Sequence, residues 1–248
     1  MRREERASDA LDFIDATADV QSESSRLAVD AGIANYRVLG VAGNYTMPVE
    51  LAVQTSTGLH RGVHMSRLVK AANGRKTRGM EQWLRWICGE VNRTQPGSSV
   101  TACFELPYDD QFAKVTMRAT QRGAITYQYR VDGMTACPCS KKMIGIGHMQ
   151  RAEMTVVLRS EKVLDSMKVV ERITECFSAR PKEHMKRLEE AKKILEAQAN
   201  PRFAEDLVRE CVSRFPDALF IRGRCFESIH AHDAIATWSA KPGWMPAI

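Results

Sequence analysis

An alternation of apolar and polar residues through the middle of the chain is the strongest constraint on its fold. Residues 100–108 (VTACFELPY) and 112–133 (FAKVTMRATQRGAITYQYRVDG) place β-branched or aromatic side chains between polar ones. A period of two residues is typical of strands with one buried face. QRGA at residues 121–124 supplies a turn between two of these strands. The pattern therefore predicts antiparallel sheet.

The flanking segments predict further strands and amphipathic helices. Two short strands around a turn are expected within residues 36–57, and a helix is expected over residues 78–93 because Met80, Trp83, Leu84, Ile87 and Val91 recur at helical spacing. A strand at 152–160 precedes expected helices at 163–177, 182–199 and 202–215, and residues 218–238 are expected to be strand. The fold class is α+β, with two successive halves of similar plan.

Composition narrows the class of protein. The chain has 248 residues, 44% of them hydrophobic and 27% charged, which indicates a globular protein. Charged residues interrupt every apolar run well before the roughly 20 residues that a membrane span requires. The first 25 residues lack the apolar segment of a secretory signal, and the seven cysteines are odd in number and mostly isolated, so we expect a cytoplasmic protein.

The formal net charge of +6 comes from 36 basic residues dispersed among 30 acidic ones. Because no dense basic tract is present, nucleic acid is not the expected partner. An anionic small substrate accounts for the excess, and so does an ordinary solvated surface.

Cys137 and His148 form the first candidate site. They lie eleven residues apart, and their thiolate and imidazole could converge on one zinc or iron(II) ion. Cys139 is too close in sequence to Cys137 for a good disulfide, and no second close cysteine pair exists for a structural four-cysteine site. This favours an open metal site, with two ordinary loop cysteines as the alternative.

A second candidate lies near the end of the chain. Glu227, His230 and His232 offer three metal-binding or proton-transferring side chains within six residues. On a regular strand the two histidines would share a face, so joint use of Glu227 and His230 requires a bend.

Other polar clusters are less specific. Residues 60–67 (HRGVHMSR) combine imidazole, guanidinium and hydroxyl groups that suit phosphate oxygens, or they form a polar loop before a helix. The acidic pairs Glu189-Glu190 and Glu205-Asp206 fall on expected helices, where such pairs usually form a solvated face.

Six motifs in order carry a family resemblance. RGVHMSR, CPCSKK, GHMQRA, MKRLEE, NPRFAED and FESIHAHDA occur between residues 60 and 236. They resemble the motifs KGtHMSR, CPCSKeI, GAHNQRS, LKRxDE, NPkFVED and NFESIHNHsA of the prokaryotic GTP cyclohydrolases of type IB.

The resemblance implies the tunnelling fold, in which two tandem modules of antiparallel sheet with paired helices assemble as homotetramers with active sites at subunit interfaces. On this plan we expect a mobile N-terminal lead-in at residues 1–34, a first module at 35–134 and a second at 135–248. The implied reaction is a metal-dependent hydrolytic opening of the imidazole ring of GTP, which releases formate and forms 7,8-dihydroneopterin triphosphate, the first step of tetrahydrofolate biosynthesis. The implied metal is a divalent Zn, Mn or Fe(II) ion.

Site roles also follow from the resemblance. It implies metal binding by Cys137, His148, Glu190, Glu227 and His230, with Cys139 a weaker candidate. Glu205 would anchor the guanine base, because one carboxylate can accept hydrogen bonds from both N1–H and the 2-amino group. His64 and His232 are the expected proton-transfer groups, and ribose and phosphates would lie near His64, Ser66, Arg67, Lys186 and Arg187.

The chain departs from the family pattern at a few positions. Arg61 replaces Lys, Met149 replaces Asn, Leu188-Glu189 replaces x-Asp, and the interval from Cys137 to His148 is one residue shorter. None of these changes removes an expected ligand. An archaeal-type enzyme that makes a 2′,3′-cyclic phosphate of dihydroneopterin, a tunnelling-fold enzyme acting on another pterin or purine, and a non-catalytic purine- or pterin-binding protein of this fold remain alternatives.

Overall fold

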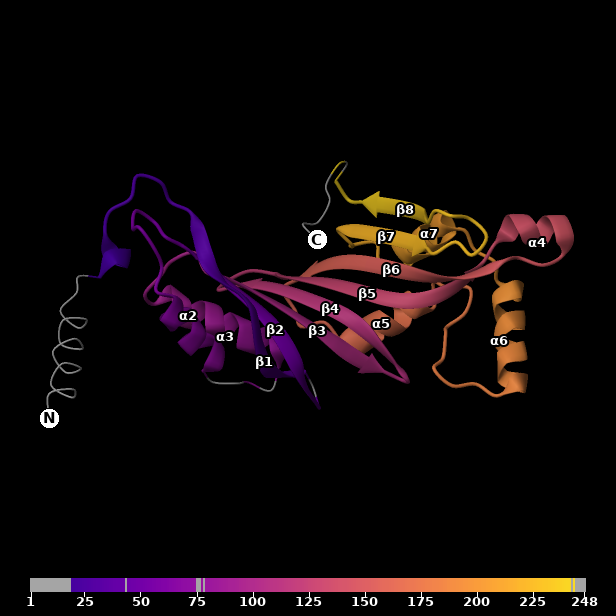
Figure 1. Cartoon of the computed structure of the whole chain (residues 1–248), viewed down its shortest axis with the longest axis horizontal. Helices are drawn as coiled ribbons and strands as arrows, with labels where there is room; N and C mark the ends of the chain where they lie inside the picture. The colour runs from indigo at the N-terminus through magenta and orange to yellow at the C-terminus, as the bar shows by residue number, and fades with distance from the viewer. Residues whose placement is uncertain (1–18, 43, 75–76, 78, 242, 244–248) are drawn as a thin grey trace, which may run out of the picture.

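One antiparallel sheet of eight strands runs through the described part of the molecule (Figure 1). The computed structural model describes residues 19–42, 44–74, 77, 79–241 and 243. The strands pair with their sequence neighbours in the order β1 to β8. They are β1 (Asp30–Ala42), β2 (Tyr45–Ser56), β3 (Ser99–Tyr108), β4 (Gln111–Thr120), β5 (Ile125–Ala136), β6 (Met149–Ser160), β7 (Phe220–Cys225) and β8 (Ala234–Ser239).

The helical segments lie mainly after the second strand of each half. They are η1 (Val20–Ser22), α2 (Met65–Asn73), α3 (Met80–Asn92), α4 (Pro138–Ile144), α5 (Ser166–Thr174), α6 (Arg187–Ala199) and α7 (Ala204–Arg214). Helices α2 and α3 stand between β2 and β3, and α5, α6 and α7 stand between β6 and β7. Each half therefore reads strand, strand, helices, strand, strand, with α4 inserted between β5 and β6. This confirms the predicted α+β tunnelling fold with paired helices.

Alternation along the strands builds the core. On β3, Val100, Ala102, Phe104 and Leu106 are buried, and the intervening residues are more exposed. Helix α3 buries the apolar positions that the sequence predicted, with Trp83 only 1% exposed. One contiguous cluster of buried side chains runs through both halves.

Three local predictions need correction. Residues 218–238 are not one strand, because a loop at 226–233 separates β7 from β8, and the Asp233 carboxylate accepts a 2.8 Å hydrogen bond from Arg224 across it. The helix expected at 163–177 is shorter, because the Asp165 side chain caps α5 by accepting from the Lys168 N–H. The CPCSKK segment, expected as loop, forms α4 because Pro138 occupies its first position.

The two halves meet between β4 and β5. Because the element order repeats from β5, we propose that the second module begins near Ile125 and not at residue 135, which lies inside that strand. The expected lead-in lies outside the described residues as far as residue 18, and β1 already begins at Asp30. Within the described residues, no helix is both long and apolar enough to span a membrane.

Candidate metal and substrate site

The ends of β5 and β6 bring Cys137 and His148 together. Cys137 follows β5 directly, and its N–H donates a 2.9 Å hydrogen bond to the carbonyl oxygen of His148, which precedes β6. Gly147 allows this approach, since a Cβ there would lie 2.6 Å from the carbonyl oxygen of Cys137. Helix α4 closes the connection between the two strands.

Among the described residues, His148, Glu227 and His230 form a group that could hold a metal ion. One ligand atom from each lies within 4.8 Å of the others. His148 and Glu227 are half-buried, whereas His230 is exposed. Cys137 is not a member of this group but lines the same pocket.

That pocket, here called the His148 pocket, has a volume of about 350 Å³. Its lining comes from the β5–β6 connection, the start of α7 and the β7–β8 loop, and it includes Cys137, Cys139, His148, Gln150, Arg202, Phe203, Glu205, Cys225, Glu227, His230 and His232. Burial raises the pKa of Cys225 to about 11, so this cysteine remains a neutral thiol beneath the pocket.

Gln150 connects two of the candidate ligands. Its Nε2 donates to Glu227 Oε1 over 3.4 Å, and its Oε1 lies 2.9 Å from His148 Nδ1. Because the amide nitrogen faces Glu227, the amide oxygen faces the imidazole, and Nδ1 must carry the proton. The lone pair of His148 then resides on Nε2, the usual arrangement in a metal-binding histidine.

The β7–β8 loop supplies the bend that joint use of Glu227 and His230 requires. The rings of His148 and His230 meet edge to face at 6.1 Å between centroids, and His230 stacks on His232 at 5.3 Å. His232 is exposed at the pocket rim, where an imidazole can exchange protons with solvent or a ligand.

Helix α7 presents Glu205 to the pocket from its first turn. The neighbouring Asp206 caps the helix by accepting the Phe203 N–H over 3.0 Å. Among the described residues, none forms a hydrogen bond or ion pair with the Glu205 carboxylate, which is exposed. Glu205 is therefore free to accept hydrogen bonds from a ligand.

Helix α6 reaches the site through its last turn. The Gln198 side chain clamps Gly147 by accepting its N–H at 2.9 Å and donating to its carbonyl oxygen at 2.7 Å. Glu190 is exposed in the first turn of α6, about 12 Å from Gln198 along the helix axis. It does not line the His148 pocket. Lys186 and Arg187 are also exposed at that end.

Two of the remaining predicted residues, His64 and Arg67, line a different pocket, here called the His64 pocket. It has a volume of about 480 Å³, and its lining includes His60, His64, Arg67 and Gln95. Gln95 accepts the His64 N–H at 2.6 Å, while its own Nε2 is buried without a partner among the described residues. Ser66 is exposed in the first turn of α2 beside this pocket.

The N-terminal segment lies along the His64 pocket. Asp19 Oδ2 is 3.3 Å from His64 Nε2, and the backbone N–H of Gly62 donates to the Gln21 carbonyl oxygen. A hydrogen bond from Ser22 outweighs burial and, with the charge of His64, holds the pKa of Asp19 below its ordinary value of 3.8.

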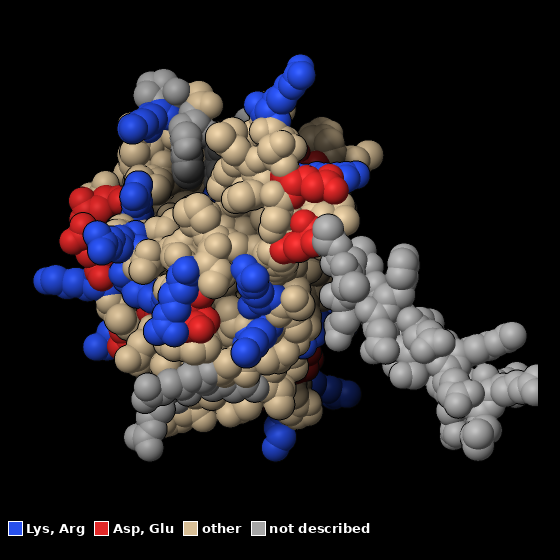
Figure 2. Space-filling view, turned by 90° about the vertical axis from the view of Figure 1, so that its left-hand side faces the viewer, with Lys and Arg blue, Asp and Glu red and all other residues tan. Residues whose placement is uncertain are grey.

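The two pockets stand at opposite ends of the molecule. In Figure 1, α2, which follows His64, lies at one end of the long axis, and α4, which follows Cys137, lies at the other. Figure 2 looks onto the α2 end, where basic side chains are spread over much of the visible surface. A single chain therefore does not bring all the predicted site residues together.

Sequence reasoning missed Gln150, Arg202 and Gln95. Gln150 stands within the GHMQRA motif, so the motif itself was the available signal. Arg202 lines the His148 pocket and pairs with Glu210 at 3.4 Å. Nothing in the sequence distinguishes Gln95 from other glutamines, because its role depends on the fold.

The family model described as "Type I GTP cyclohydrolase folE2" matches residues 28–236. The chain is 29% identical over 196 residues to the GTP cyclohydrolase FolE2 of Geobacter sp. (strain M21), a match covering 71% of this chain and 73% of the relative. It is 31% identical over 238 residues to the GTP cyclohydrolase MptA of Aeropyrum pernix, covering 78% and 83%. Among solved structures, a uricase from Arthrobacter globiformis aligns with a TM-score of 0.45 at 10% identity, covering 90% of this chain and 97% of that one.

Proposed function

This chain belongs to the type I GTP cyclohydrolase FolE2 family, and we propose that it is a metal-dependent GTP cyclohydrolase that forms 7,8-dihydroneopterin triphosphate and formate. The observation that carries the proposal is the convergence of His148, Glu227 and His230 in a pocket that also contains Cys137 and Glu205. A purine-binding carboxylate beside a set of metal ligands is the combination that this reaction requires.

The donor set fits a divalent transition metal. Two imidazoles and a carboxylate lie within 4.8 Å of one another, and a thiol lines the same pocket. Nitrogen, oxygen and sulfur donors suit Zn, Mn or Fe(II). We propose that Cys137, His148, Glu227 and His230 hold the ion, which when bound supplies Lewis-acid activation of water.

Residues of the chain itself orient the substrate and move protons. We propose that Glu205 accepts hydrogen bonds from N1–H and the 2-amino group of guanine, a donor pair that adenine lacks. Gln150 keeps Nδ1 of His148 protonated, which leaves Nε2 as the donor atom. His232, exposed at the rim, is the proposed proton-transfer group on this side.

We further propose that a second copy completes each site. The His148 pocket lies near the lower end of the size range of small-molecule sites. Among the described residues that line it, Arg202 is the one Lys or Arg, and Glu210 already pairs with that guanidinium. The phosphates therefore need cations from elsewhere, and His64 and Arg67 at the far end of a neighbouring chain have the required chemistry.

The proposed assembly is a homotetramer joined through the sheet. Within the described residues, β1 and β8 each pair on one side only, so their outer edges are open to another strand. Exposed apolar residues near the His148 pocket, namely Met143, Ile144, Ile146 and Ile229, are available for burial between copies. Glu190, exposed in a single chain, would join the metal environment only in this assembly.

Incubation of the purified protein with GTP and Zn²⁺, Mn²⁺ or Fe²⁺ tests the proposal. We expect one formate per GTP and a pterin that becomes fluorescent after oxidation. Failure with all three metals would contradict the proposal. Similarity to an archaeal MptA favours a second candidate product, the 2′,3′-cyclic phosphate, and mass spectrometry of the product separates the two.

A further inference from the structure

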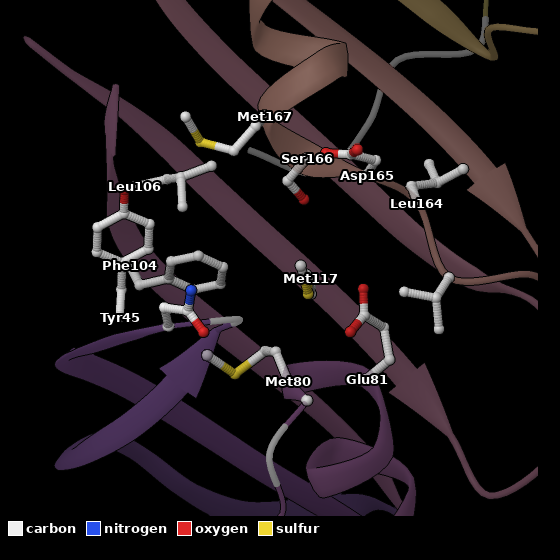
Figure 3. A pocket seen from close by; sticks show the side chains of 13 residues that line it. Tyr45, Met80, Glu81, Phe104, Leu106, Met117, Leu164, Asp165, Ser166 and Met167 are labelled. Carbon is white, nitrogen blue, oxygen red and sulfur yellow. The ribbon is translucent and has the colours of Figure 1, made fainter. Parts of the chain in front are cut away.

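A third cavity lies away from both pockets, where the helices of the two halves approach each other (Figure 3). It has a volume of about 510 Å³ and is bounded by the start of α3, by β3 and β4, and by the segment that leads into α5. Its walls are apolar and include Met80, Phe104, Leu106 and Met117. It shares no lining residue with the His148 pocket or the His64 pocket.

The described residues that line this cavity include acidic groups, whereas the chain as a whole is basic. Glu81 and Asp165 line it, and no Lys, Arg or His is among its described lining residues. The formal net charge of the chain is +6. The described lining of the cavity is thus apolar and carries acidic groups, in a chain whose net charge is positive.

Glu81 sets the chemistry of the cavity. The residue is only 8% exposed, and in Figure 3 its carboxylate extends between α3 and the start of α5. The Tyr127 hydroxyl lies 3.2 Å from Glu81 Oε1. Burial above all, together with the charge of Glu81, raises the pKa of Tyr127 far above its ordinary value, so the phenol keeps its proton and is the donor.

This hydrogen bond satisfies only part of the carboxylate. A carboxylate can accept about four hydrogen bonds, and no Lys or Arg of the described part of the chain forms an ion pair with Glu81. Buried carboxylates are rarely left without a positive partner, because the charged form is poorly solvated in an apolar environment.

We propose that this cavity binds a small organic cation, an apolar body that carries one protonated amine. The ammonium would donate to the free lone pairs of Glu81, a charge-assisted bond stronger than one between neutral groups. The apolar body would contact the ring of Phe104 and the methionine side chains, which adapt their shape to a ligand. The inference goes beyond the proposed function, since it involves no residue of the GTP site.

The test uses the full-length protein with ¹³C-labelled methionine methyl groups. Phenethylammonium is the probe, and 2-phenylethanol is a neutral analogue of similar shape. We expect saturable shifts at Met80, Met117 and Met167, none at Met143 on the distant α4, and at least tenfold tighter binding of the ammonium than of the alcohol. Equal affinity for the two probes, or shifts at Met143 alone, would overturn the proposal.

Two substitutions on α3 test whether the negative charge of Glu81 binds the ammonium group. Glu81→Gln keeps an acceptor for Tyr127 but removes the negative charge, and should weaken ammonium binding at least tenfold while leaving alcohol binding unchanged. Glu90→Gln, at a partly exposed position paired with Arg93 on the same helix, should bind both probes as the wild type does. Unchanged ammonium affinity in Glu81→Gln would refute the assignment. The comparison of the two probes on the wild-type protein decides the matter if that variant does not fold.

Discussion

At the start of α6 and α7, neighbouring acidic residues have different roles. Glu189 accepts the Lys186 N–H at 2.9 Å, and Asp206 accepts the Phe203 N–H at 3.0 Å, so each caps its helix. No hydrogen bond or ion pair of the described residues engages the carboxylates of Glu190 and Glu205. In both pairs the free carboxylate is the one to which the family resemblance assigns a function.

Single substitutions should separate metal binding from base binding. Cys137→Ala and His148→Ala should lose bound metal, because each removes a proposed donor atom. Glu205→Ala should keep its metal and bind GTP about 10- to 100-fold more weakly, the effect of removing hydrogen bonds to a charged group. Elemental analysis gives the metal per chain, and calorimetry gives GTP affinity. The control is Asp206→Asn, which retains a capping side chain. Equal metal loss in all three variants would refute the separate assignments.

Residue identity predicted part of this site. The proximity of Cys137 and His148 follows from their short separation in sequence. The bridge through Gln150 could not be predicted, because it depends on which end of the amide faces Glu227. The position of Glu190 also depends on the fold, since α6 contacts the site through its last turn.

Among the elements, α7 is fixed to its surroundings by ion pairs. Glu210 pairs with Arg214 at 2.9 Å and with Arg202 at 3.4 Å, and Arg214 also pairs with Glu175. Burial alone would raise the pKa of Glu210, but the hydrogen bond from Arg214 and the two guanidinium charges outweigh it and hold the pKa below its ordinary value of 4.5. These pairs hold the helix that presents Glu205.

This lowered pKa predicts a dependence of stability on pH. A carboxyl group with a depressed pKa in the folded state contributes stability above its unfolded pKa and loses it as pH falls through its folded pKa. Glu210→Gln should therefore lower the free energy of unfolding by about 0.5–1 kcal/mol near neutral pH. The difference from the wild type should disappear below the folded pKa of Glu210. Urea unfolding between pH 3 and 7 measures both, and a constant difference across that range would contradict the assignment.

The hydrophobic periodicity of the sequence predicted those helices and strands that have one face buried in the core. Helix α3 and strands β3, β4 and β5 followed it closely, because one face of each is buried in the core. The loop at 226–233 was missed, because apolar residues flank it and the reversal depends on the contact of Arg224 with Asp233.

For the whole molecule, the distance between the His148 and His64 pockets has a functional consequence. If copies complete each other's sites, two variants that are each inactive can restore activity together. His64→Ala lacks one half of the proposed site, and His148→Ala lacks the other.

Subunit mixing tests this arrangement. Equal amounts of the two variants, dissociated and reassembled together, should regain about a quarter of wild-type activity. Each site then has an intact His64 in about half of the cases and, independently, an intact His148 in about half. Two batches of His148→Ala mixed in the same way provide the control and should stay inactive. Absence of recovery in verified mixed oligomers would show that both residues serve one chain.

Assembly through the open outer edges of β1 and β8 would make activity depend on the concentration of the protein. If the active site forms only when subunits assemble, enzymatic activity rises more steeply than protein concentration. A modest fall in expression would then lower the rate of product formation disproportionately. Dilution would then dissociate the subunits and abolish activity, so the amount of polypeptide in the cell would itself regulate the enzyme.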